Sequence, residues 1–209
     1  MSNGIKVKKR NGRGTEALNL EKMHKMVDEA TQGLAGVSAS QVEIQSGIQF
    51  YDGITTAEIQ EILIKSASDL IDLEHPNYQF VAARLLLFSV RKSLYGRSRE
   101  LPELEDHIVK CVGHEVYDGD IYSKYSKEDI EKANGYIDHN RDFLFTYAGL
   151  RQVADKYLVQ DRSTGQVYET PQFMYMMIAL TIFAEYPKET RLNYVRRYYD
   201  AISRHKLNI

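Results

Sequence analysis

The chain has 209 residues, of which 43% are hydrophobic, enough for one large domain or two small ones with a real core. Its 27 Lys and Arg residues against 29 Asp and Glu residues give a net charge of −2, which excludes a general nucleic-acid binder because such proteins carry a basic excess. Cys111 is the single cysteine, which excludes an internal disulfide and a cysteine-based zinc site.

Membrane and secretion signals are missing from the sequence. The longest apolar run, FMYMMIALTIFA at residues 173–184, is shorter than the ~18 residues of a membrane span and predicts a buried helix. The stretch MSNGIKVKKR at residues 1–10 lacks the apolar core of a signal peptide. We therefore expect a cytoplasmic protein that binds neither membrane nor nucleic acid.

The chain up to residue 96 predicts a small β-hairpin and four helices. IKVKKR and TEALNL flank NGRG at residues 11–14, and Asn-Gly is a hairpin signal because both residues tolerate a positive φ. Periodic apolar residues predict helices at 20–34, 38–50, 55–71 and 77–95. We expect Asn19 to cap the first helix, Ser38 the second and Thr55 or Thr56 the third, and Gly96 to end the fourth.

The remainder of the chain predicts a second, mainly helical domain. RSRELPE at 97–103 is typical of a linker, and helical patterns follow within 104–117, 126–158, 171–187 and 188–209. Ser-Thr-Gly at 163–165 lies between β-rich flanks and predicts a second hairpin. The expected fold is therefore mainly α, with one domain at 1–96 and another at 97–209.

Several cations lie close together in sequence around the first hairpin. Lys9 and Arg10 precede the turn, and Lys22 falls in the first turn of the first helix. A helix N-terminus presents N–H groups and the positive end of its dipole, so an additional cation there is favourable when an anion occupies the site. Glu16 and Asn19 are poor phosphate ligands but suit a sugar or an exocyclic amine. The set favours a nucleoside triphosphate, and a solvated basic strand is the alternative.

Three segments resemble the ATP-cone, the allosteric domain at the N-terminus of many ribonucleotide reductase large subunits. They are VKKRNGRGTEALNLEKMHKMV (7–27), DGITTAEIQEILIKSA (52–67) and YQFVAARLLLFSVRKSLYG (78–96). Two later segments, at 139–179 and 189–203, are similar to the helical region that follows the cone in aerobic class I large subunits. The resemblance covers nearly the whole chain, and it implies a β-hairpin capped by a four-helix bundle, then a helical domain.

The resemblance also implies an allosteric effector, ATP or dATP, bound with Mg²⁺. Lys9, Arg10, Lys22 and Lys92 match the phosphate-binding cations of the family. The other residues that the resemblance places at the nucleotide are Val7, Glu16, Asn19, Met23, Thr56, Gln60 and Phe88. Gln60 stands where many relatives carry a histidine, and the hairpin turn is one residue longer than usual. The first departure leaves open how tightly deoxyribose is distinguished from ribose, and the second leaves open the position of Glu16.

No catalytic residue or catalytic cofactor is expected in this chain. The resemblance implies that catalysis needs at least three active-site cysteines, whereas this chain has one, Cys111. We expect Cys111 to be a buried, unreactive thiol. The 15 tyrosines do not indicate a radical pathway, because the pathway tyrosines of the family lie near its C-terminus. The catalytic barrel of the family begins beyond the last residue of this chain.

Two interpretations follow. In the first, the chain is the N-terminal part of a reductase large subunit and works in an oligomer with the catalytic barrel and a radical-generating small subunit. In the second, it is a stand-alone ATP/dATP sensor, although the known ATP-cone repressors carry a zinc ribbon that one cysteine cannot build. The first interpretation also predicts that residues 173–183 and a face formed by Leu192, Val195, Tyr199 and Ile202 are exposed and dock on the barrel.

Overall fold

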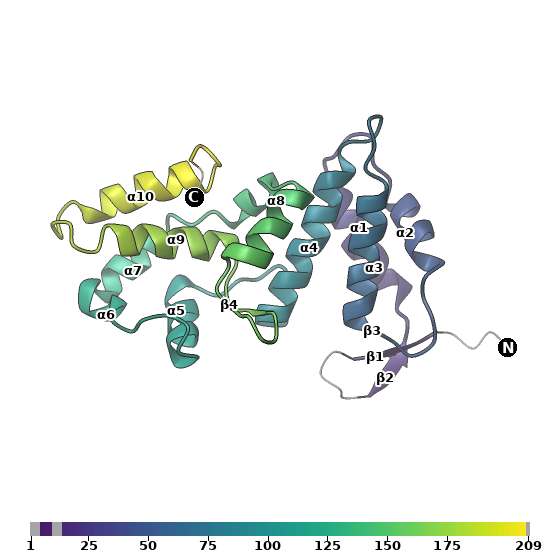
Figure 1. Cartoon of the computed structure of the whole chain (residues 1–209), viewed down its shortest axis with the longest axis horizontal. Coiled ribbons are helices and arrows are strands. Elements are labelled where there is room, and N and C mark those ends of the chain that lie inside the picture. The colour runs from purple at the N-terminus through teal and green to yellow at the C-terminus, as the bar shows by residue number, and fades with distance from the viewer. Residues whose placement is uncertain (1–4, 10–13, 208–209) are drawn as a thin grey trace. The chain divides into compact units, whose positions relative to one another are not determined.

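The computed structural model describes residues 5–9 and 14–207 and is mainly helical, as predicted (Figure 1). The chain divides into two compact units, Met1–Ser89 with Phe145–Arg151 and Val90–Leu144 with Gln152–Ile209. The domain boundary that the sequence suggests after residue 96 stays a proposal, and the division between the units at Ser89 and Val90 falls within α4 (Tyr78–Tyr95). Among the described residues, no helix combines the length and apolar character needed to cross a membrane.

A three-stranded sheet in the order β2-β1-β3 lies in the first unit. Its strands are β1 (Lys6–Lys8), β2 (Thr15–Ala17) and β3 (Ile54–Thr55). β1 pairs antiparallel with β2 and parallel with β3, so Val7 lies opposite both Glu16 and Ile54. The hairpin prediction is confirmed, but its predicted Asn11-Gly12 turn lies outside the described residues. The sequence did not predict β3, since a two-residue strand leaves no periodic pattern.

The four predicted helices of the first unit are present. They are α1 (Leu20–Thr31), α2 (Ala39–Gly47), α3 (Thr56–Asp69) and α4 (Tyr78–Tyr95), and α1 to α3 run side by side above the sheet in Figure 1. Asn19 and Ser38 cap the first two helices as predicted. Thr55 caps α3 in a reciprocal arrangement with Glu58, which satisfies two backbone N–H groups at once.

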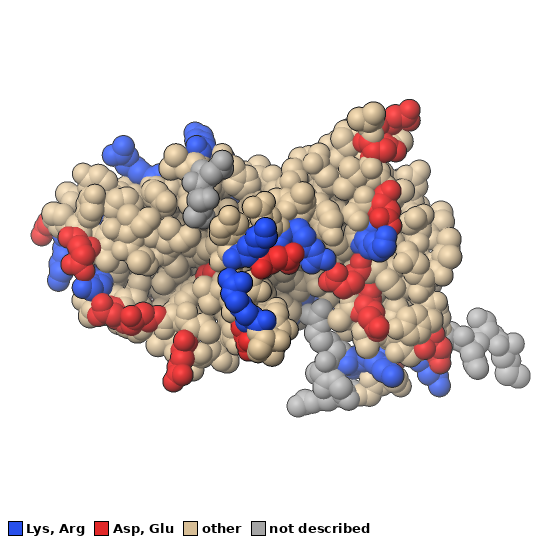
Figure 2. Space-filling model, in the orientation of Figure 1, with Lys and Arg blue, Asp and Glu red and all other residues tan. Residues whose placement is uncertain are grey.

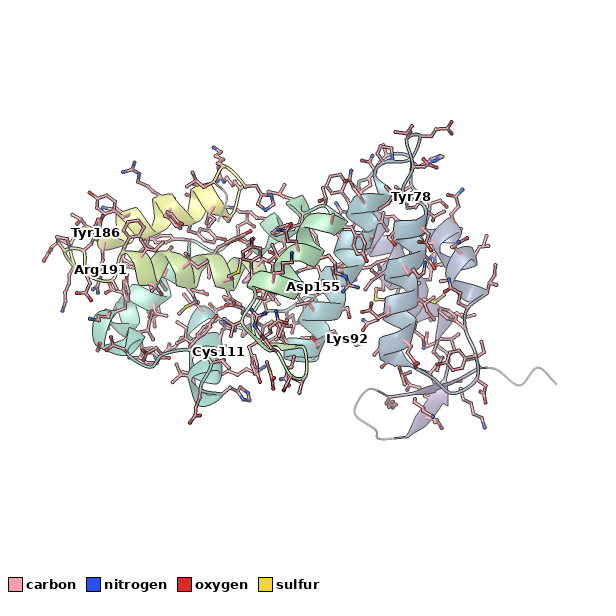
Figure 3. All side chains as sticks on the ribbon, viewed as in Figure 1. Tyr78, Lys92, Cys111, Asp155, Tyr186 and Arg191 are labelled. Carbon is pink, nitrogen blue, oxygen red and sulfur yellow. The ribbon has the colours of Figure 1, made fainter. Side chains whose placement is uncertain are left out.

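Buried apolar side chains and a few polar anchors hold the first unit together. Val27, Leu63 and Val81 are fully buried. The hydroxyl of Tyr78 donates to Gln41 Oε1 over 2.6 Å and accepts from the backbone N–H of Ser38 over 3.0 Å, which joins the start of α4 to the start of α2 (Figure 3). These contacts fix the helices that carry the candidate site.

The second unit contains shorter helices and one small hairpin. Its elements are α5 (Leu104–Gly113), α6 (Ile121–Lys124), α7 (Lys127–Asn134), the 3₁₀ helix η1 (His139–Leu144), the π-helix η2 (Val153–Tyr157), α9 (Pro171–Ile182) and α10 (Arg191–Ile202), with β4 (Gln160–Asp161) antiparallel to β5 (Gln166–Val167). α8 (Tyr147–Gln152) lies almost entirely in the first unit. The predicted second hairpin is confirmed.

The helical pattern at 126–158 does not form one helix. Gly135 ends α7, and the backbone N–H of Asp138 then donates to the hydroxyl of Tyr199 over 2.9 Å instead of to a carbonyl of its own segment. Thr146 restarts the helix, since its hydroxyl accepts from the N–H of Gly149. Tertiary contacts therefore override a periodic pattern that local sequence alone predicts as helical.

The expectation that residues 173–183 and the Val195 face of α10 are exposed is wrong. Phe173, Val195 and Tyr199 are completely buried, and Ile202 is 2% exposed. The physical reason is that α9 and α10 pack against each other along their lengths, so each covers the apolar face of the other (Figure 1). Of these segments, Ile182 at the end of α9 is a large apolar residue that stays exposed.

Candidate functional site

The candidate site begins at β1, the central strand of the sheet, which alternates between buried and exposed residues. Val7 is 3% exposed and packs in the core, whereas Lys6 and Lys8 on either side of it are exposed. Lys9 follows, and its backbone N–H donates to the carbonyl of Gly14 across the hairpin over 3.2 Å. Figure 2 shows Lys and Arg side chains gathered over this hairpin. A strand this short thus anchors one apolar residue and presents cations to solvent.

Lys9 is held only by an exposed ion pair with Glu16. Its Nζ lies 3.2 Å from Glu16 Oε2, and the two side chains are 44% and 43% exposed. An exposed ion pair of this kind contributes about 0–1 kcal/mol, so a polyphosphate can displace Glu16 at little cost. The structure therefore brings two predicted site residues together and leaves the cation accessible. Arg10, predicted beside Lys9, lies outside the described residues.

The start of α1 holds two further predicted residues, Asn19 and Lys22. Asn19 Oδ1 accepts a hydrogen bond from the backbone N–H of Lys22 over 2.8 Å, which makes Asn19 the N-cap. The side chain of Lys22 is exposed in the first turn, where the helix dipole is positive. The side-chain oxygen of Asn19 is thus already engaged with the helix, whereas Lys22 is accessible to an anion.

The sheet register sets the relative placement of these groups. β3 runs parallel to β1 with Thr55 opposite Lys8, so α3 begins beside the end of β1 that leads to Lys9. β2 runs the other way, with Ala17 opposite Lys6, so the chain reaches α1 past the other end of β1. Three residues of strand separate these ends by roughly 10 Å. Lys9 and the start of α3 therefore lie together, and the start of α1 lies farther along.

The start of α3 already carries its own negative charge. Thr56 is the first residue of the helix and is partly buried, while the capping role belongs to Thr55. Hydrogen bonds from the Thr55 side chain and backbone, and one from the Tyr51 hydroxyl, lower the pKa of Glu58. Glu58 was not predicted from the sequence, although the Thr-x-x-Glu spacing from Thr55 to Glu58 is typical of a capping box. An ionised Glu58 makes this helix end less favourable for phosphate.

Three other predicted residues are buried in the first unit. Met23 is 9% exposed, Phe88 is 3% exposed and Gln60 is 4% exposed. Ser89 on α4 donates to Gln60 Oε1 over 3.4 Å, so the residue that departs from the family pattern takes part in the packing of α3 against α4. The structure gives these side chains a core position, and their predicted contact with a nucleotide stays a prediction.

Lys92 lies in the last turn of α4 and is exposed (Figure 3). A cation is favourable there because the C-terminal end of a helix is negative. Lys92 belongs to the second unit, while every other described site residue belongs to the first. Its predicted role as a phosphate ligand therefore stays a prediction.

Two titratable groups of the second unit, Cys111 and His107, are buried. Cys111 is 1% exposed, its thiol donates to the carbonyl of Tyr168 over 3.6 Å, and burial raises its pKa to about 12. His107 stacks on Phe173 with ring centroids 4.1 Å apart, and burial lowers its pKa to about 3. Both groups are thus neutral at pH 7, and the pair is not an activated nucleophile. Cys111 is buried, as the sequence predicted.

A buried charge pair stabilises the same unit. Arg91 lies 2.8 Å from Asp142 Oδ2, and Gln172 donates to Asp142 Oδ1 over 2.9 Å. Arg191, also buried, lies 2.6 Å from Asp129 with its guanidinium 4.1 Å from the centroid of the Tyr125 ring (Figure 3).

Among the described residues, no group of three or more His, Cys, Asp or Glu side chains is arranged to hold a metal ion.

Two family models match the chain. The ATP cone domain matches residues 5–93, and the all-alpha domain of ribonucleotide reductase matches residues 143–209. The first match contains the sheet, α1 to α3 and most of α4, and the second begins just before α8 and runs to the end of the chain. Both matches agree with the mainly helical fold described above.

The chain is also similar over its whole length to curated proteins. Ribonucleoside-diphosphate reductase 1 subunit alpha of Escherichia coli is 48% identical over 209 residues, and subunit alpha of Haemophilus influenzae is 46% identical over the same length. Subunit alpha of Enterobacteria phage T4 is 41% identical over 197 residues. The chain spans 27% of the two bacterial proteins and 26% of the phage protein. The chain therefore belongs to the ribonucleoside-diphosphate reductase alpha subunits, and it corresponds to their N-terminal part, an ATP-cone followed by all-alpha sequence.

Proposed function

We propose that this chain binds ATP or dATP through its ATP-cone and thereby regulates the overall activity of a reductase alpha subunit. The observation that carries the proposal is the match of residues 5–93 to the ATP cone domain, which coincides with exposed cations at a short hairpin. A charge-assisted hydrogen bond contributes about 1.5–3 kcal/mol, so three or four cations can hold a triphosphate against its hydration.

Within this proposal, Lys9, Arg10, Lys22 and Lys92 bind the phosphates, and Glu16 and Asn19 face the nucleoside. Lys9 leaves Glu16 when the triphosphate arrives, and the carboxylate of Glu16 is then available to the nucleoside. Apolar contact and the remaining lining come from Val7, Met23, Thr56, Gln60 and Phe88. The accessible cations of the structure fit such a ligand, and any Mg²⁺ would be held chiefly by the phosphate oxygens.

The reduction of ribonucleoside diphosphates is proposed for the complete alpha subunit and not for this chain alone. The chain supplies one cysteine, which is buried and protonated, so the thiol chemistry must come from other parts of the protein. We propose that its partners are the catalytic barrel of the alpha subunit and a radical-generating small subunit, in an oligomer. A stand-alone sensor is not favoured, since residues 143–209 match a reductase domain.

Calorimetric titration of ATP, dATP and GTP into the chain tests the proposal. We expect saturable binding of ATP and dATP and much weaker binding of GTP, together with no turnover of any ribonucleoside diphosphate. Absence of ATP and dATP binding would contradict the effector role. Turnover by the pure chain would contradict the assignment of catalysis to the rest of the subunit.

A further inference from the structure

The second unit contains a groove of about 680 Å³, and its lining includes none of the predicted nucleotide-site residues. It is lined by α6 and the residues just before it, by the segment around Tyr157 and Val159, and by one face of α9. Apolar side chains form its floor, among them Ile121, Met174, Met177, Ile178 and Ile182. Unbranched methionine side chains adapt to what they contact, so this floor suits a flexible hydrocarbon chain.

A buried carboxyl group, that of Glu169, forms part of the groove wall. Glu169 is 1% exposed, its Oε2 accepts from the hydroxyl of Tyr117, and its Oε1 accepts from the backbone N–H of Val159 over 2.7 Å. These two bonds use about half of the acceptor capacity of a carboxylate, and both donors are neutral. Burial raises the pKa of the Glu169 carboxyl, because it disfavours the charged form. A cation in the groove would stabilise that charge across a medium of low dielectric constant.

A hydrogen-bonded chain of neutral groups lies behind Glu169. The Tyr117 oxygen lies 3.2 Å from His107 Nε2, and His107 Nδ1 lies 3.3 Å from the hydroxyl of Tyr95. Because burial lowers the pKa of His107 to about 3, the imidazole is neutral at pH 7 and brings no positive charge to Glu169. The chain can polarise toward the carboxylate, but it does not neutralise it. A buried carboxyl of raised pKa at the wall of an apolar groove is a candidate ligand-binding group.

Further carboxylates add to the negative charge of the groove. The described residues that line it include the acidic residues Asp118, Asp120, Glu169 and Glu185 and the basic residue Lys124. Lys124 Nζ lies 2.6 Å from Glu185 Oε1 and 3.9 Å from Asp120 Oδ2, so its charge is already compensated. Acidic side chains are visible over α6 in Figure 2. The groove therefore attracts a cationic occupant.

The carboxylates are spread along the apolar floor instead of meeting at one point. Glu169 precedes α9 and Glu185 follows it, and the 12 residues of this helix span roughly 18 Å. A metal ion needs several oxygens in one place, and no carboxylates in the described part of the chain are grouped in that way. An occupant that contacts both the charges and the floor between them needs several cationic groups joined by apolar chain.

We propose that this groove binds a linear aliphatic polyamine, whose ammonium groups pair with the carboxylates and whose methylene chains pack on the methionine and isoleucine floor. The inference goes beyond the proposed function and does not depend on it, since it concerns another site and another ligand. A lysine side chain offers the same ammonium on a hydrocarbon stem but carries a single charge. It therefore matches one carboxylate of the groove and not the set.

Calorimetric titration of spermidine into the full chain tests the proposal. Nucleotide is left out, because a polyamine also binds free triphosphate. We expect saturable binding that is roughly tenfold tighter than the binding of Nα-acetyl-lysine amide, since that probe lacks the additional ion pairs. Mg²⁺ added at the same ionic strength should not displace spermidine, because it cannot use the apolar floor.

Carboxylate variants locate the binding. Glu169→Gln keeps a side-chain acceptor but removes the charge, and should weaken spermidine binding roughly tenfold. Asp118→Asn should weaken it roughly two- to fivefold, the range for losing one exposed ion pair. Its amide oxygen can still accept from the backbone N–H of Asp120, as Asp118 Oδ1 does over 2.9 Å. Glu189→Gln is the matched control, because Glu189 is an exposed carboxylate outside the groove lining, and it should leave the affinity unchanged.

Four results would overturn the proposal. They are no saturable spermidine binding, equal binding of the lysine probe, full displacement by Mg²⁺, and an affinity that falls as much in Glu189→Gln as in Asp118→Asn. Circular dichroism of each variant shows whether it is folded. If Glu169→Gln does not fold, the comparison of Asp118→Asn with Glu189→Gln decides the outcome, because both changes are at exposed positions.

Discussion

Charged side chains are placed differently in the two units of this chain. In the first unit the cations of the candidate site are exposed, and Lys9 is held only by an exposed pair with Glu16. In the second unit Arg91 and Asp142 are 6% and 0% exposed and are joined by hydrogen bonds to the surrounding core. The difference fits the proposed function, in which exposed charges of the first unit bind a ligand, whereas the buried Arg91–Asp142 pair stabilises the fold of the second unit.

The largest effect is expected from breaking the buried pair of the second unit. Asp142→Ala leaves the charge of Arg91 buried without its carboxylate and should lower the free energy of unfolding by about 3–5 kcal/mol. Chemical denaturation followed by circular dichroism measures this change. A loss below about 1 kcal/mol, the size expected of an exposed pair, would mean that the second unit does not depend on its buried charges.

A smaller effect is expected from the pH dependence of His107. The imidazole takes up a proton at its ordinary pKa of 6.5 in the unfolded chain, but only near pH 3 in the folded protein, because burial disfavours the charged form. The unfolded state therefore binds more protons below pH 6.5, and stability decreases as the pH falls. Between pH 7 and pH 5 this group should account for a loss of about 2 kcal/mol.

The His107→Gln variant isolates that contribution, since glutamine does not titrate. The variant is expected to be less stable than the wild type at pH 7, because it loses the stacking on Phe173, but its stability should fall less between pH 7 and pH 5. Denaturation curves at the two pH values provide the comparison. Equal losses in both proteins would show that His107 is accessible to protons in the folded state.

Nucleotide binding should respond to the exposed cations of the site. Lys9→Ala and Lys92→Ala are each expected to weaken ATP binding roughly tenfold, near the lower end of the contribution of a charge-assisted hydrogen bond. Lys25→Ala is the control, because Lys25 is an exposed cation on α1 that pairs with Glu21. Cys111→Ser should leave affinity unchanged. Calorimetry that gives equal affinities for wild type and Lys9→Ala would remove Lys9 from the site.

The smallest effect is expected for an exposed pair on α3. Lys65 lies 2.6 Å from Asp69, and the two side chains are 65% and 42% exposed. Lys65→Met keeps the length and helix propensity of the side chain and should change the free energy of unfolding by less than about 0.5 kcal/mol. A loss comparable to that of Asp142→Ala would erase the contrast between the two units.

The sequence predicted the features that depend on neighbouring residues. The hairpin, the caps at Asn19 and Ser38 and the helices of the first unit follow from turn chemistry, capping and periodicity within short windows. The Arg91–Asp142 pair was not predictable, because its partners are 51 residues apart and each alone resembles an ordinary surface charge. The same holds for the contact of Tyr117 with Glu169 and for the placement of residues 145–151 in the first unit.

The candidate site was predicted in parts. Lys9 and Glu16 were predicted as site residues because they lie beside the predicted hairpin turn, and the structure places their side chains 3.2 Å apart. The structure shows which predicted residues are exposed and which are buried: the cation Lys9 is accessible, whereas the side chains of Met23, Gln60 and Phe88 pack in the core. The apolar segments of α9 and α10 were misjudged, since a sequence shows that a face is apolar but not which element covers it.

Hydrogen exchange with and without ATP tests the central claim most directly, because it locates the ligand among the two units. We expect slower amide exchange in β1, β2 and the first turn of α1 when ATP or dATP is added, and no change in α9 of the second unit. Lys9→Ala should reduce this protection at the same nucleotide concentration. Protection confined to α9, or no protection in either unit, would contradict the claim that the exposed charges of the first unit bind the nucleotide.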